Sequence, residues 1–484
     1  MGNPTIHPTG ATLYNPEKAQ SGYTIFQAAN EGALLVDMNG KEVHLWKGLR
    51  GFPNKIFPGG FVLGHTFNRD PKFGFQDEGD LVQLDFEGNI VWKFDRHQFI
   101  ADPGHEARWQ ARAHHDYQRT GSPVGYPAPG QEPQTTEGNT LILVHRDVKN
   151  EKISKHNLLD DAFIEVDWEG NIVWEWNAHE HFDELNFSED AKKAIYEEPN
   201  RRFFGNHSGD WLHINSISLV GPNRHYDNGD ERFHPDNIIW DAREANIIAI
   251  TSKATGEIVW QIGPDYDDEQ TKHLGWIIGQ HHAHIIPKGL PGEGNVLVFD
   301  NGGWGGYGAP NPNSVDGNKV AIRDHSRILE INPVTLEIVW QYTGLEAKFS
   351  VPTDSYKFYS PYISSAQRLE NGNTLITEGS NGRIFEVTAD HEIVWEYISA
   401  YKNERGSNMV YRAYRVPYNW VPQLEIPTEI AIEPIDVKDF RLPNAAVGGA
   451  HSIVEVTEAF SYGEGALCVA RYDETVEKKE TNEV

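Results

Sequence analysis

One pattern recurs along this chain and limits its fold more than any other feature. Six times, an apolar run is followed by a tight turn and a second apolar run that ends in tryptophan; these tryptophans are Trp46, Trp92, Trp174, Trp260, Trp340 and Trp395. β-Branched residues on both sides of a short polar turn are typical of a β-hairpin. The chain therefore predicts six related hairpins. Each Trp is expected to pack against the next copy while its indole N–H reaches a polar partner.

A second hairpin precedes most of these copies. Its turn is a Gly-Asn pair at 138–139, 294–295 or 372–373, and an apolar strand follows each pair. Asn and Gly accept the positive φ angle that tight hairpins need. Two successive hairpins make a four-stranded antiparallel sheet, which is one blade of a β-propeller. We therefore expect an all-β, six-bladed β-propeller as a single domain over residues 1–472. A charged, disordered tail is expected at 474–484.

The positions of the hairpins set the expected blade boundaries. Five blades are continuous in sequence and are expected at about 53–95, 111–176, 211–262, 280–342 and 361–397. The sixth blade is expected to combine both ends of the chain, with residues 449–470 as its inner strands and residues 23–46 as its outer ones. Joining the ends in one sheet leaves no open edge in the ring. The stretch 398–448 is expected to be a long insertion.

The chain is strongly acidic, with a formal net charge of −29. Such a surface repels phosphate backbones and anionic lipids, which argues against nucleic-acid and membrane partners. A small anionic or aromatic substrate is expected, and an anionic one needs local positive charge in its pocket. The single cysteine, Cys468, excludes an intramolecular disulfide. No signal peptide is visible, so we expect a soluble cytoplasmic protein, or a periplasmic one if a signal was removed.

Histidines gather at one predicted place in the fold. In a propeller, the first strand of each blade lines the central channel. The heads of the predicted first strands carry His114-His115, His213 with Asn215, His281-His282, Tyr362 with Ser364, and His451. Imidazoles that converge on one axis are costly to charge together, so a shared function is the simplest reason for this placement. We therefore predict a functional site on the propeller axis.

Three kinds of chemistry suit such a site. Histidines bind an anion as imidazolium donors, act as acid, base or nucleophile, or ligate a metal as neutral rings. The candidate catalytic residues, which include an arginine clamp for an anionic substrate, are His213, His281, Arg327 and His451. The candidate substrate-binding residues are His114, His115, Asn215, Ser364 and Tyr362. The alternative metal ligands are His115, His213, His281 and His451. By contrast, His145 is interpreted as part of a packing group in a loop.

Several segments of this chain are similar to one known family. They are the opening residues 8–24, the segment 211–216 and the segment 280–302. On these motifs the chain resembles the bacterial arylsulfotransferases (aryl-sulfate sulfotransferases). The resemblance implies a six-bladed propeller and a ping-pong reaction without a cofactor. In that reaction an aryl sulfate gives its sulfuryl group to an axial histidine, and a phenol then accepts it. The resemblance assigns the stabilisation of the sulfuryl oxygens to axial residues that correspond here to His213, His281 and Arg327.

One position departs from the pattern of that family. The nucleophilic histidine of the family is expected in the first strand of blade five, where residues 362–367 contain no histidine. Three functions therefore stay open. The first is arylsulfotransferase-like transfer through another histidine, such as His451. The second is a metal-dependent hydrolase or lyase, in which the histidines hold a divalent ion. The third is a non-catalytic propeller that binds a ligand.

Overall fold

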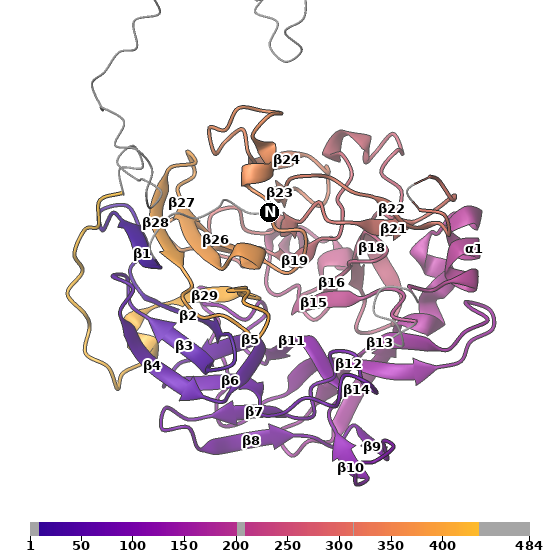
Figure 1. Ribbon diagram of the computed structural model, residues 1–484, viewed down its shortest axis with the longest axis horizontal. Helices are drawn as coiled ribbons and strands as arrows, with labels where there is room; N and C mark the ends of the chain where they lie inside the picture. Colours follow the sequence, from indigo (N-terminus) through magenta and orange to yellow (C-terminus); the bar gives the residue numbers. More distant parts are fainter. Residues whose placement is uncertain (1–8, 201–208, 313, 435–484) are drawn as a thin grey trace, which may run out of the picture. The chain divides into compact units, whose positions relative to one another are not determined.

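Six antiparallel sheets, arranged around a common centre in Figure 1, contain nearly all the strands of the computed structural model. The structure describes residues 9–200, 209–312 and 314–434. Five of the sheets have four strands and one has five. The all-β, six-bladed propeller that the repeats predict is therefore confirmed.

The first three blades follow one another along the chain. Blade 1 consists of β5 (Arg50–Phe57), β6 (Phe61–His65), β7 (Leu81–Leu84) and β8 (Ile90–Phe94). Blade 2 consists of β11 (Ala113–Arg119), β12 (Thr140–Val148), β13 (Leu158–Val166) and β14 (Ile172–Asn177). Blade 3 consists of β15 (Ile214–Leu219), β16 (Ile238–Ala242), β17 (Ile247–Thr251) and β18 (Ile258–Ile262).

The last three blades include both ends of the described chain. Blade 4 consists of β19 (His281–Ile285), β20 (Val296–Asp300), β23 (Arg327–Ile331) and β24 (Ile338–Tyr342). Blade 5 consists of β25 (Ser365–Arg368), β26 (Thr374–Glu378), β27 (Arg383–Val387), β28 (Ile393–Ile398) and β1 (Gly10–Tyr14). Blade 6 consists of β29 (Ala413–Val416), β2 (Tyr23–Ala28), β3 (Gly32–Val36) and β4 (Glu42–Lys47).

Short elements connect the blades and their strands. Two small hairpins are β9 (Gln98–Ile100) with β10 (Arg108–Gln110), and β21 (Gly305–Tyr307) with β22 (Asn318–Ala321). The α-helices are α1 (Glu189–Glu197) and α2 (Arg224–Asp227); the 3-10 segments are Ala178–Leu185, Glu231–Phe233, Lys272–Leu274, Ser355–Lys357, Gly379–Asn381 and Tyr418–Trp420. Within the described ranges, no helix is both long enough and apolar enough to cross a membrane.

The inner strand of each blade contacts the inner strands of its two neighbours. The order of contact is β29, β5, β11, β15, β19, β25 and back to β29, which closes the ring. Apolar residues fill the space between neighbouring blades, for example Ile217, Ile238 and Trp240 of blade 3 beside Leu143 and Phe163 of blade 2. The inner strands thus place their first residues around a single axis.

The inner strand of blade 6 differs from the expected one. It is β29, whose residues Ala413–Val416 pair with Tyr23–Phe26 of β2. The sequence assigned this stretch to the insertion 398–448 and gave the inner position to residues 449–470, which lie outside the described residues. The strand was missed because it is short, carries Arg415 within it, and pairs with a strand from the other end of the chain rather than with a hairpin partner.

The repeated tryptophans link each blade to the next. The Nε1–H of Trp46, in blade 6, donates to the carbonyl of Asp85 in blade 1 at 2.9 Å. The other five donate in the same way to backbone carbonyls of Trp168, Lys253, Pro333, Ala389 and Met38. The last of these, from Trp395 to Met38, joins blade 5 to blade 6 and completes the ring. The predicted indole contacts are therefore present in all six copies.

A buried ion cluster joins several inner strands at the axis. The carboxylate of Asp116 on β11 accepts from Lys55 Nζ of β5 at 2.6 Å and from Arg412 Nη1 at 2.7 Å. All three side chains are fully buried. The same carboxylate also accepts from the backbone N–H of Ile217 on β15, at 3.2 Å. One carboxylate thus holds strands of blades 1, 2 and 3 and the residue that precedes β29.

The cluster predicts a large cost for Arg412→Met. The variant keeps the length of the side chain but leaves the buried Asp116 with one of its two cations. Breaking a buried ion pair costs about 3–5 kcal/mol, so we expect the free energy of unfolding, measured by urea titration, to fall by that amount. The control is Arg232→Met, since Arg232 is an exposed arginine paired with Asp230; its loss should stay below about 0.5 kcal/mol. Equal losses in the two variants would contradict the role of the cluster.

Candidate active site

The heads of the inner strands share an unusual backbone conformation. His115, His213 and His282 have positive φ angles of 54°, 52° and 56°, and Ser364 has one of 93°. In β11, β15 and β19 the strand register shifts at these points. A bulge of this kind redirects a side chain, and a positive φ costs energy in any residue other than glycine. The same strained turn therefore repeats at the heads of four inner strands.

The structure brings His115 and His213 together, as the sequence predicts. Their ring centroids are 4.7 Å apart, in an edge-to-face arrangement. Phe52, at the start of blade 1, lies 4.7 Å from the ring of His115 and stacks on Tyr411 at 3.9 Å. These four rings come from β5, from β11 and from the segments just before β15 and β29, so the site forms only in the closed propeller.

His213 is held by a carboxylate. Its Nδ1 lies 2.5 Å from Oδ2 of Asp210, and the side chain of His213 is 11% exposed. Burial acts to raise the pKa of Asp210, but the adjacent His213 prevails and holds that pKa below its usual range. An ionised Asp210 fixes the ring proton on Nδ1, so Nε2 carries the lone pair. His213 is thus oriented as a base or nucleophile.

His115 is connected to a second group of buried side chains. Its Nδ1 lies 2.8 Å from Nδ1 of His114. The ring of His114 stacks on His145 at 3.5 Å, and Nε2 of His114 lies 3.3 Å from Oδ1 of Asp161. Burial above all, and then the neighbouring histidines, lower the pKa of His114 and His115 well below the usual value. Both rings are therefore neutral near pH 7.

His281 takes part in the site through its position rather than through a free nitrogen. Its Nδ1 lies 2.8 Å from Oδ1 of Asn301, and its Nε2 accepts from the backbone N–H of Ile363 at 3.1 Å. Burial, followed by the charge of Arg243, lowers the pKa of His281 well below its usual value. The ring is therefore neutral and ties blade 4 to the segment before blade 5.

The arginine that the sequence selected as a clamp, Arg327, is not among the cationic groups near the axis. Arg327 lies at the start of β23, where its Nε donates to Asp300 at 2.7 Å and its other nitrogens donate to the carbonyls of Leu274 and Trp276. Sequence reasoning missed Lys55, Asp116 and Arg243. Single charged residues within strands follow no periodic pattern, so no signal marked them. Arg412 was visible only as part of a basic and aromatic stretch.

The other candidate residues have mixed placements. The hydroxyl of Ser364 donates to Ser360 Oγ at 2.8 Å and accepts from the N–H of Gly379, so it is fully engaged. The side-chain amide of Asn215 is buried and donates to the carbonyl of Gln280, while the backbone carbonyl of Asn215 accepts from Arg412. Tyr362 is 38% exposed. His451 lies outside the described residues.

A cavity of about 400 Å³ borders on Phe52 and Tyr411, and the axial histidines are not among its lining residues. Among the residues that line it are Gln27, Arg50, Phe52, His65, Met409 and Tyr411. Phe52 and Tyr411 belong to both the cavity wall and the shell around His115. The volume lies within the range of small-molecule sites, and the aromatic walls suit a flat ring.

Comparison with known proteins identifies the family. The model of the arylsulfotransferase family matches residues 131–412, more than half of the chain. The chain belongs to the arylsulfotransferase family. The matched region includes His213, His281 and Arg327 and ends at Arg412, whereas His114 and His115 precede it. The family that the sequence motifs indicated is therefore confirmed. A search of the curated proteins finds no relative.

Solved structures resemble this arylsulfotransferase-family chain only distantly. One is a protein of unknown function from Bacteroides caccae, with a TM-score of 0.41 and 10% identity over 82% of this chain and 99% of the other. Another is virginiamycin B lyase from Staphylococcus aureus, with a TM-score of 0.33 and 11% identity over 82% of this chain and 87% of the other. Likenesses at this level carry no functional argument.

A buried carboxyl group between the inner strands, that of Asp241, predicts that the stability of the fold depends on pH. Asp241 of β16 accepts from Ser216 on β15 and from the backbone N–H of Ala283 on β19, and burial raises its pKa from 3.8 to about 7. Because the pKa of Asp241 is higher in the folded than in the unfolded chain, its protonated form favours the folded state. This stabilisation is complete below about pH 4 and is lost as the pH rises to about 7. In Asp241→Asn the side chain is neutral throughout. We expect the unfolding free energy of the wild type, relative to the variant, to fall by about 4 kcal/mol over that range. Parallel pH profiles of the two proteins in urea titrations would contradict this.

Proposed function

We propose that this protein transfers a sulfuryl group from an aryl sulfate to a phenolic acceptor, and that His213 carries the group between the two steps. The observation that supports this best is the pair of Asp210 and His213 on the axis of a propeller of this family. The sequence left the nucleophile open, because the family position in blade 5 holds Ser364. An oriented imidazole with a carboxylate on its far nitrogen is the form that a histidine nucleophile requires.

The first step forms a covalent intermediate. The lone pair on Nε2 of His213 attacks the sulfur, the N–S bond forms, and the S–O bond to the aryl group breaks. The aryl oxygen leaves with the bonding electrons as a phenolate. The imidazole gains positive charge, which the carboxylate of Asp210 stabilises through the proton on Nδ1. In the second step the oxygen of the acceptor phenol attacks the same sulfur, the N–S bond breaks, and the phenolic proton passes to solvent.

Negative charge on the sulfuryl oxygens needs donors in a site that excludes water. His115 lies beside His213 and can present its Nε2–H to one of these oxygens. The buried cluster of Lys55, Asp116 and Arg412 carries two positive charges and one negative charge. Its excess positive charge acts on the rings of His281 and His282, although the chain as a whole is strongly acidic. This local excess is the feature that an anionic substrate requires.

The cavity beside His115 is the proposed binding place for the aryl ring. Phe52 and Tyr411 supply flat apolar surface, and Met409 supplies an adaptable one. Both aromatic side chains contact His115, so a ring bound there lies close to the imidazoles.

The alternative metal centre, of whose predicted ligands His115, His213 and His281 lie in the described residues and His451 does not, has less support. His281 has hydrogen bonds at both nitrogens, and His213 uses Nδ1 for Asp210. Among the residues that the structure describes, the group with metal-ligand spacing contains none of these three histidines. The sulfuryl-transfer proposal therefore needs no metal at His213.

Loss of His213 tests the proposal directly. We expect His213→Ala to lower kcat by about 10⁴-fold or more with a chromogenic aryl sulfate and a phenol. Rapid quenching of the wild type without acceptor, followed by mass spectrometry, should find one added SO₃ group on the peptide that contains His213. The control is His234→Ala, a histidine on an exposed loop, which should keep full activity. Transfer by wild type with the sulfuryl group on another residue would contradict the assignment.

Asp210 is expected to act as a positioning residue. In Asp210→Asn the amide no longer fixes the proton on Nδ1 of His213, so a larger share of the rings carries it on Nε2. We expect kcat to fall by about 10²–10⁴-fold while KM changes little, because the substrate does not contact Asp210. Steady-state kinetics with the same aryl sulfate separate the two parameters. A rise in KM at constant kcat would show instead that Asp210 serves binding.

A further inference from the structure

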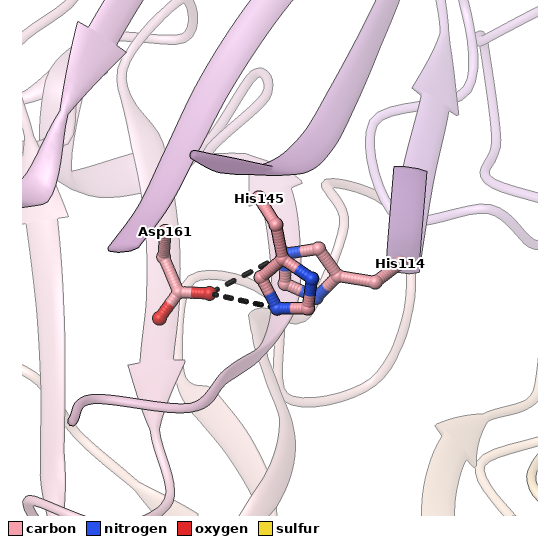
Figure 2. Close-up of side chains that lie close together, drawn as sticks. All are labelled: His114, His145 and Asp161. Atoms are coloured by element: carbon pink, nitrogen blue, oxygen red, sulfur yellow. Dashed lines mark ion pairs between the residues drawn. The ribbon is translucent and has the colours of Figure 1, made fainter. Parts of the chain in front are cut away.

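Three ligand-type side chains meet inside blade 2, next to the sulfuryl site, which His114 contacts through His115. His114 is on β11, His145 on β12 and Asp161 on β13, and all three point toward one spot (Figure 2). His145 lies directly opposite Asp161 in the strand register. All three are buried, and their ligand atoms lie within 4.8 Å of one another. A rigid sheet therefore fixes the three groups, including His145, which the sequence interpretation treated as packing.

Two atoms of this group lack hydrogen bonds. Nε2 of His114 and Oδ1 of Asp161 are buried, and no described residue forms a hydrogen bond with either. They lie 3.3 Å apart, and Nε2 of His145 lies 3.9 Å from the same oxygen; these contacts, dashed in Figure 2, are ion pairs only where the imidazole is protonated. Polar atoms that are buried without partners are costly, and each one in a native fold requires an explanation.

The surroundings are also short of positive charge. Asp161 has two other carboxyl groups, Asp160 and Asp210, as neighbours. No lysine or arginine among the described residues forms an ion pair with Asp161. The nearby Arg69 and Arg112 are instead paired with Asp77. The geometry thus presents a carboxyl group between two imidazoles, with no lysine or arginine paired to it.

We propose that Nε2 of His114, Nε2 of His145 and Oδ1 of Asp161 bind one divalent transition-metal ion of the zinc class. Two imidazoles and one carboxylate are a common ligand set for such ions, with water at the remaining positions. The ion would satisfy both orphan atoms and supply the missing positive charge. Since the two imidazole rings are now parallel, binding must turn them so that both lone pairs point at the ion.

The groups behind the ligands fit this assignment. Nδ1 of His145 lies 2.7 Å from Oδ1 of Asp77, and two arginines hold Asp77 in place. A carboxylate behind a histidine ligand fixes the ring and places its proton away from the metal. The pKa of Asp77 is far below its usual range, because the arginine and histidine contacts outweigh its burial. Asp77 is therefore ionised and suited to this outer role.

The metal would also set the proton position on His115. A metal on Nε2 of His114 leaves the proton of that ring on Nδ1, which then donates to Nδ1 of His115 at 2.8 Å. His115 must in turn carry its own proton on Nε2, the nitrogen left for the site beside His213. This consequence rests on the proposed sulfuryl transfer: the metal makes His115 a donor to the sulfuryl oxygens.

Metal titration of the full chain tests the site. After removal of metals with a chelator, calorimetry with Zn²⁺ should give one ion per chain, and Co²⁺ should give the visible absorption of a nitrogen- and oxygen-ligated ion. We expect Asp161→Asn and His145→Gln to weaken Zn²⁺ binding by at least about 100-fold, and Asp77→Asn by about 10–100-fold. The control is His284→Gln, a buried axial histidine that bonds to Tyr126 instead; its Zn²⁺ affinity should equal that of the wild type.

Two outcomes would overturn the proposal. One is a wild-type chain that binds no Zn²⁺ or Co²⁺ at one ion per chain, which would mean that a proton neutralises Asp161. The other is binding that Asp161→Asn and His145→Gln leave unchanged. Circular dichroism of each variant checks that it folds. These titrations use no substrate, so failure of sulfuryl transfer through His213 and failure of the metal site are separate results.

Discussion

The carboxylate of Asp116 is the interaction on which the rest of this propeller depends. A ring of six sheets has no covalent closure, and blade 6 joins strands from both ends of the described chain. Asp116 accepts hydrogen bonds from Lys55 of blade 1 and from Arg412, the residue before β29. It also accepts from the backbone N–H of Ile217 in blade 3. The contacts draw the heads of the inner strands to one centre, which is also where the imidazoles lie. Closure of the fold and assembly of the site are thus one event.

The same cluster reconciles an acidic protein with an anionic substrate. A buried group with two cations and one anion costs solvation energy, which the many carboxylate, carbonyl and N–H contacts offset. What remains is positive charge at the axis, beneath a surface whose net charge is negative. The backbone at His115, His213 and His282 is strained for a related reason, because the bulges there turn side chains that would otherwise lie within the sheet. The strained backbone lowers stability at the axis, and in return it orients the side chains there.

The fold could be predicted from the sequence because its signals repeat in every blade. Residues that occur once, without a repeated pattern, could not be recognised in this way. The six tryptophans predicted the blades, because every copy obeys the same hairpin chemistry. The approach of His115 to His213 was predictable from their places at strand heads. Arg327 was misleading, since its partner Asp300 lies on a neighbouring strand and no local signal reveals that pairing. Lys55, Asp116 and Asp161 were missed because the sequence does not show whether a charged residue in a strand faces solvent or the axis.

A crystal structure of the protein with bound sulfate would test the central claim most directly, because sulfate has the oxygens of the transferred group without its reactivity. We predict one sulfate on the propeller axis, with an oxygen within hydrogen-bond distance of Nε2 of His115 and with its sulfur facing Nε2 of His213. We also predict that Asp210 keeps its contact with Nδ1 of His213. An axis without sulfate at saturating concentration, or a sulfate bound only at surface lysines, would contradict the account.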